Sequence, residues 1–169
     1  MPLAQFSLMK RVGTSPGSES DTGWNPCFLN EDLVSTNHGS YPVQAPESGY
    51  EYSYENWLRL KCTQAPDNAV ANIKAWYASV GPGTGLDIFV GTTASYATPT
   101  SDASSVATAN ATTYPDAGSA LAWGTPQADD KITAINQYTD YLVTQLRVAA
   151  AVVQGDIATQ ILHVRWDES

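Results

Sequence analysis

Histidines and carboxylates are the side chains that could do acid–base chemistry, and this chain offers few in useful patterns. His38 lies in a probable turn and His163 in a strand-like run, and no serine lies in a G-x-S-x-G elbow. In an extended chain, the two members of an adjacent acid pair point to opposite faces, so they are poorly placed to act together on one substrate. We therefore expect these pairs to be solvated acids in turns. These pairs are Glu31-Asp32, Asp129-Asp130 and Asp167-Glu168. We therefore predict no catalytic residue.

Metal and cofactor motifs are also missing from the sequence. It has no Cys/His cluster with zinc spacing, no calcium-loop pattern, and no glycine-rich nucleotide-binding motif. We predict no metal, no cofactor and no enzymatic activity. Cys27 and Cys62 could pair in an oxidising compartment, but we favour two reduced, partly buried thiols.

Charge and composition exclude several classes of partner. The formal net charge is −9, and no Lys or Arg occurs between Ala75 and Asp130. Such a surface repels phosphates and anionic lipid, so we expect neither nucleic acid nor membrane as a partner. The N-terminus lacks an apolar signal-peptide core, and no run is long enough to span a bilayer. We expect synthesis in a host cytoplasm.

Alternation of apolar and polar residues predicts a β protein. Runs with period two cover residues 4–12, 55–63, 72–80, 86–93, 104–110, 131–137, 140–152 and 158–169. About eight short antiparallel strands favour two packed sheets, and we predict a jelly-roll-like β-sandwich over residues 55–169. An immunoglobulin-like sandwich is the alternative. The last two strands are expected near the sheet centre.

The N-terminal third differs from the rest. One predicted strand, a polar linker (13–23) and a proline-bearing aromatic stretch (24–54) make up a segment of residues 1–54. Prolines disfavour a long helix or a central strand there, yet large aromatic rings are costly to leave in water. We therefore predict an extended arm whose aromatic side chains bind a neighbour: Trp24, Phe28, Tyr41, Tyr50, Tyr52 and Tyr54. Packing in the core is the expectation for Trp57, Trp76 and Trp166.

Several strand motifs carry a resemblance. They are a W-x-R-L strand at 57–60, an N-I-K-x-W strand at 72–76, a Y-A-T-P loop at 96–99, a D-Y-L-V-x-Q-L-x-V strand at 140–148, and a C-terminal strand that ends near Asp167-Glu168. Over residues 56–169 the chain resembles small structural proteins of tailed bacteriophages. That resemblance implies a virion component on the capsid surface, a head decoration (cement) protein bound as dimer or trimer to the major capsid protein. A tail-associated or head-surface glycan-binding module is the alternative.

Overall fold

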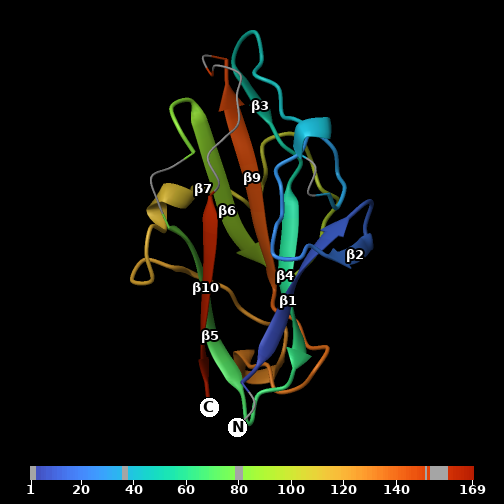
Figure 1. Cartoon of the computed structure of the whole chain (residues 1–169), viewed down its shortest axis with the longest axis vertical. Helices are drawn as coiled ribbons and strands as arrows, with labels where there is room; N and C mark the ends of the chain where they lie inside the picture. Colours follow the sequence, from blue (N-terminus) through green and yellow to red (C-terminus); the bar gives the residue numbers. More distant parts are fainter. Residues whose placement is uncertain (1–2, 36–37, 79–81, 151, 153–159) are drawn as a thin grey trace.

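The structure is a computed structural model that describes residues 3–35, 38–78, 82–150, 152 and 160–169. Within these residues the protein is all-β, with antiparallel strands in two sheets, as the sequence predicted (Figure 1). Its helical segments are the 3-10 turns η1 (His38–Ser40), η2 (Ala111–Thr113) and η3 (Ala128–Asp130). No helix in the described chain is long enough to cross a membrane.

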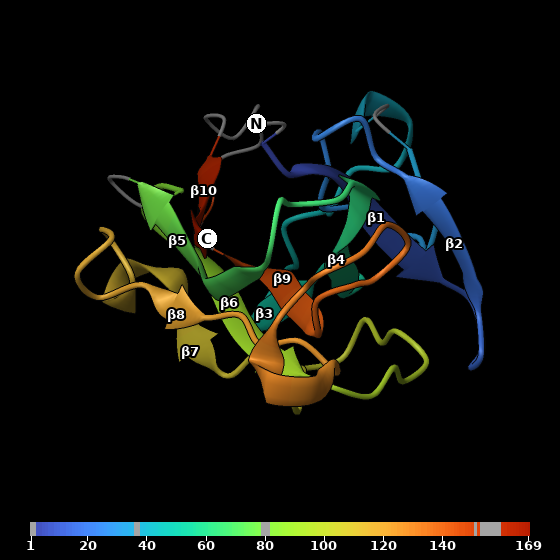
Figure 2. The same ribbon diagram turned by 90° about the horizontal axis from the view of Figure 1, so that it is seen from below.

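Seven strands form the larger sheet, in the order β2-β1-β4-β9-β6-β7, with β3 also paired to β9. The bounds are β1 Gln5–Val12, β2 Ser18–Asp21, β3 Tyr50–Tyr52, β4 Asn56–Gln64, β6 Leu86–Thr93, β7 Ala109–Asn110 and β9 Tyr141–Ala149. The smaller sheet has the order β10-β5-β8, from Ile161–Glu168, Val70–Ala78 and Leu121–Ala122. Figure 2 shows the larger sheet curving from β7 round to β2, with the smaller sheet facing one part of it.

The core lies between the two sheets. Alternate residues of β1, β4 and β9 point inward and meet β5 and Trp123 in one apolar cluster. Its fully buried members include Leu8, Leu58, Leu60, Val70, Ile73, Trp123 and Leu142. A second cluster continues along β6 and β9 through Ile88, Val90, Leu146 and Val148. Leu86 of β6 packs against the same cluster, so alternate residues of β6 face the core.

The outer face of the larger sheet is covered by the loop of residues 94–108. Val106 and Ala107 from this loop pack on Trp57, Tyr141 and Val143. A methyl group on Gly91 would lie 2.0 Å from the Val106 carbonyl oxygen, so the close approach of loop to strand requires glycine there. The larger sheet is thus buried on both faces over this region.

Some strand predictions were wrong. Residues 131–137 form a turn, with only Ile132 bridging to Val70, and Asn136 has a φ of 63°. The predicted strand at 104–110 is reduced to two residues, and β2, β3 and β8 were missed. Of the last two strands, β9 is central but β10 is an edge strand of the smaller sheet. Jelly-roll connectivity stays a prediction.

Candidate functional site

The six aromatic residues predicted to form an interface lie in different surroundings. Phe28 packs against the Ile88–Leu146 cluster, while Tyr41, Tyr52 and Tyr54 are half-buried. Only Trp24 and Tyr50 are largely exposed, at 49% and 55% of their surface. Trp24 follows β2 at the start of residues 24–54, whereas Tyr50 begins β3 near the end of this segment (Figure 1). The structure does not gather these six side chains on one surface, and their interface role stays a prediction.

Tyr50 is held by its own chain. The Arg147 guanidinium lies 4.3 Å from the centre of the Tyr50 ring, and its Nη2 donates to Asp87 Oδ2 at 2.7 Å. Arg147 also packs over Phe89. Since Arg147 projects from β9 opposite Tyr52 and Asp87, these groups form one cross-strand ladder on the outer face. The ladder positions β3 against β9.

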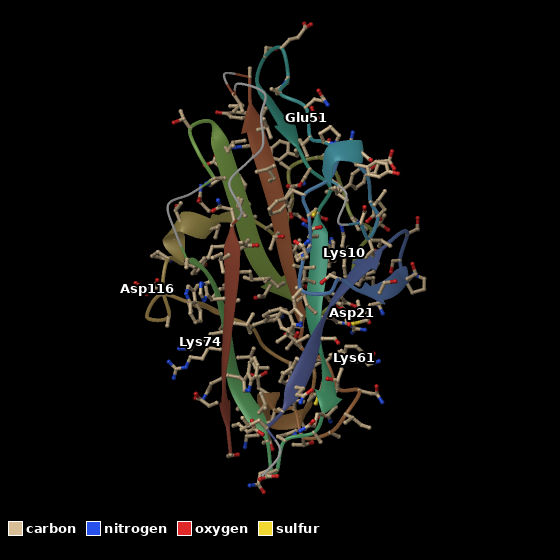
Figure 3. All side chains as sticks on the ribbon, in the orientation of Figure 1. Lys10, Asp21, Glu51, Lys61, Lys74 and Asp116 are labelled. Carbon is tan, nitrogen blue, oxygen red and sulfur yellow. The ribbon has the colours of Figure 1, made fainter. Side chains whose placement is uncertain are left out.

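A polar hollow of about 390 Å³ lies where β1 and β2 meet the segment that follows them. It is lined by Lys10, Asp21, Thr22, Asn25, Pro26, Cys27, Val34 and Ser35. Figure 3 shows Lys10 and Asp21 on these neighbouring strands, and Met9 pairs with Asp21 in the register between them. Its volume falls in the range of small-ligand sites.

Lys10 is the unusual residue in this hollow. It follows Phe6 and Leu8 on the inward face of β1, and only 2% of its surface is exposed. Its Nζ donates to the Leu33 carbonyl oxygen at 2.9 Å. Burial lowers the pKa of Lys10 to about 8, although the nearby Asp32 carboxylate acts in the opposite direction. Asp32 instead accepts from the Gly13 amide at 2.6 Å, and its other oxygen is buried without a hydrogen-bond partner among the described residues.

Trp24 stands on the turn that joins the residues lining this hollow. The Asn25 amide donates to the Thr22 carbonyl at 3.2 Å, which closes a tight turn with Gly23 and Trp24 as its central residues. Their φ angles are 59° and 61°. Positive φ at both central positions is typical of type I′ turns, which strongly favour Gly and Asn. A tryptophan is therefore held exposed at a backbone position that disfavours it.

The smaller sheet has a stacked aromatic pair on its outer face and an edge strand, β10. Its outer face carries the Trp76 ring stacked on His163, with ring centres 5.2 Å apart and planes at 10°. At one edge, β10 makes no backbone hydrogen bond to any described residue except those of β5. Glu168 accepts from the Ala4 amide and Trp166 packs on Phe6, so the C-terminal part of β10 is partly covered by the N-terminus.

Two of the residues that could have done chemistry make contacts within the fold. Asp167 accepts from the Asn72 amide group, and His163 is stacked as above. The side chain of His38 lies outside the described residues. Cys27 and Cys62 are both free thiols, as favoured from the sequence. In the described part of the chain, no group of His, Cys, Asp or Glu could hold a metal ion.

Sequence reasoning missed the hollow, although one signal for it was present. Lys10 continues the inward positions Ala4, Phe6 and Leu8 of the first predicted strand, so the alternation already implied a buried lysine. The turn at Trp24 gave no such signal, because Gly23 alone does not fix the φ of the next residue. Searches of protein-family models, curated proteins and solved structures find no match to this chain.

Proposed function

We propose that the chain is a non-enzymatic structural protein of a tailed-bacteriophage particle, a head decoration protein that binds the major capsid protein and neighbouring copies of itself. The resemblance of residues 56–169 to phage structural proteins suggests this class. The edge of β10 that pairs with no described residue is the observation that supports it best, because unpaired strand edges are templates for pairing with another chain.

The two halves of β10 differ in a way that favours pairing along the first half. Arg165, Asp167 and Glu168 place charges in the second half, and the register shifts between Arg165 and Asp167. Charges and bulges are the devices that protect an edge from pairing. The first half, residues 161–164, has no charged Lys, Arg, Asp or Glu, and Ile161 is 56% exposed.

On a capsid shell, even the short edge of residues 161–164 can give stable attachment. Many copies held on one surface convert weak contacts into strong overall binding through effective concentration. The net charge of −9 keeps free subunits apart in solution until a matching surface is met. A binding role therefore needs no cleft for a substrate.

The test is cryo-electron microscopy of particles assembled with the wild-type chain, together with a matched pair of variants. Ile161→Lys introduces charge at the edge of β10, whereas Ile135→Lys makes the same change in a turn at the same 56% exposure. We expect at least tenfold lower occupancy for Ile161→Lys and wild-type occupancy for Ile135→Lys, with equal melting temperatures. A chain absent from purified particles overturns the proposal, and equal occupancy of the two variants overturns the role of the edge.

Glycan binding is the second candidate function. The turn that carries the half-exposed Trp24 borders the polar hollow, which favours this function because an aromatic ring near polar groups can hold a sugar ring.

A further inference from the structure

We infer that the hollow between β1, β2 and residues 25–35 is a binding site for a neutral saccharide, with the Trp24 ring as its stacking platform. This site is independent of the capsid proposal, because a protein on or off a particle can carry it. It also differs from the β10 edge, which belongs to the other sheet.

The backbone at Trp24 is the first step of the argument. The side chain with the largest apolar surface occupies a φ of 61°, where Gly or Asn would fit without cost, and it is exposed rather than packed. Among the described residues the Trp24 ring makes no aromatic stacking and no cation–π contact, and about half of its surface is exposed. Strained residues that persist at a surface are characteristic of binding sites.

The position of the ring is the second step. Thr22 before the turn and Asn25 after it both line the hollow, so the turn that carries Trp24 borders it. The turn is fixed, because the Gly23 amide donates to Asp21 Oδ1 at 2.8 Å and Thr22 Oγ1 donates to the Leu8 carbonyl at 3.0 Å. A preorganised platform reduces the entropic cost of binding.

The charge of the hollow decides the class of ligand. Lys10 contributes a cation at its base, which disfavours a cationic guest. Asp21 lines the same hollow and Asp32 lies close enough to Lys10 to affect its charge, which disfavours an anionic guest. The remaining polar side chains of the lining are Asn25, Ser35 and Thr22, whose hydroxyl proton is already donated to the Leu8 carbonyl. Mixed donors and acceptors beside a flat apolar ring suit the hydroxyls and C–H faces of a neutral sugar.

The experiment is a glycan array probed with the full-length chain, followed by titration of each hit using intrinsic tryptophan fluorescence. Trp57 and Trp123 are buried, so a signal that disappears in a Trp24 variant reports on this turn. We expect neutral oligosaccharides among the hits. Trp24→Gly should bind at least tenfold more weakly, while Tyr50→Ala, which removes the other exposed ring of the segment, should bind as the wild type does.

The stability of Trp24→Gly separates this inference from a merely structural role. Because glycine accepts the positive φ, this variant should melt at or above the wild-type temperature while it loses binding. A clear fall in melting temperature would show that the ring stabilises the fold, and would overturn the argument. No hit on the array, hits confined to acidic glycans, or unchanged binding by Trp24→Gly would each overturn it as well.

Discussion

Two regions of this molecule bury polar side chains in opposite ways. On the outer face of the larger sheet, the buried Gln145 and Glu55 have partners for their polar atoms: Glu55 Oε2 accepts from Trp57 Nε1 at 2.9 Å and from the Thr100 amide at 3.2 Å. At the hollow, Lys10 has no carboxylate within 4.0 Å among the described residues, and Asp32 keeps a buried oxygen without a partner. Satisfied polar groups stabilise a fold, whereas unsatisfied groups beside open space cost stability and can bind a ligand.

The largest expected effect is at Gln145, on the satisfied side. Its Nε2 donates to the carbonyls of Ser53 at 2.9 Å and Asp102 at 2.8 Å, and its Oε1 accepts from the Ser104 amide at 2.9 Å. Gln145→Leu would leave these backbone groups unpaired in the interior. We expect the free energy of unfolding to fall by about 3 kcal/mol, measured by urea denaturation.

Gln137 provides the matched control for that prediction. Its Oε1 accepts from the amides of Thr133 at 2.6 Å and Ala134 at 2.9 Å, but this turn is exposed to water, which can replace the lost bonds. Gln137→Leu should therefore cost less than about 1 kcal/mol. Equal losses for the two variants would contradict the view that burial makes the Gln145 bonds important.

Lys10 tests the unsatisfied side, through the dependence of stability on pH. Its pKa falls from 10.5 to about 8 because burial disfavours the ammonium, so above pH 8 the unfolded chain binds more protons than the folded chain. The folded state of the wild type should therefore gain stability relative to Lys10→Met as pH rises. Between pH 7 and 9.5 we expect a relative gain of about 2 kcal/mol.

The measurement is chemical denaturation of both proteins at each pH, and only the difference between them is interpreted. Titratable groups far from Lys10 cancel to first order in that difference, whereas the Cys27 thiol and the Asp32 carboxylate interact with Lys10 and contribute to it. At pH 7, Lys10→Met should be at least as stable as the wild type, because it removes a buried charge at the cost of one hydrogen bond to Leu33. Parallel pH profiles would show that Lys10 is solvated in the folded protein.

The sequence predicted the strands that line the core better than it predicted the proposed binding sites. Alternation located β1, β4, β5, β6, β9 and β10, because each has one face in the core. It failed at residues 131–137, where the apolar residues suggested a strand. In the structure Ile135 is exposed, Ile132 alone is buried, and only Ile132 forms a bridge, to Val70. Pairing partners lie far apart in the chain, and one sequence does not reveal them.

The candidate site depended on tertiary placement for the same reason. The buried state of Lys10 follows from its register on β1, but the hollow exists only because residues 25–35 pass over that strand. Gln145 was equally hidden, since its partners belong to segments about 40 and 90 residues away in sequence. Aromatic content predicted one interface from six residues of the N-terminal segment, but only Trp24 and Tyr50 among them are largely exposed, and they lie in different elements.

Arg59 and Arg11 on the outer face of the larger sheet give the smallest and most direct test, because both approach the carboxylate of Glu19 and only Arg59 hydrogen-bonds to it. Arg59 binds Glu19 with two nitrogens, Nη2 to Oε2 at 2.9 Å, and its guanidinium lies 3.8 Å from the Tyr138 ring centre. Arg11 Nε lies 3.9 Å from Glu19, and its guanidinium is 5.3 Å from the Tyr96 ring centre. Lysine keeps the charge but cannot make the planar, two-nitrogen contact.

Arg59→Lys should therefore lower the free energy of unfolding by about 1 kcal/mol and Arg11→Lys by less than about 0.5 kcal/mol, measured by denaturation at two salt concentrations. Equal losses that both vanish at high salt would mean that charge alone stabilises the contacts of Glu19. Hydrogen-bond geometry would then not distinguish the outer face of the sheet from the hollow.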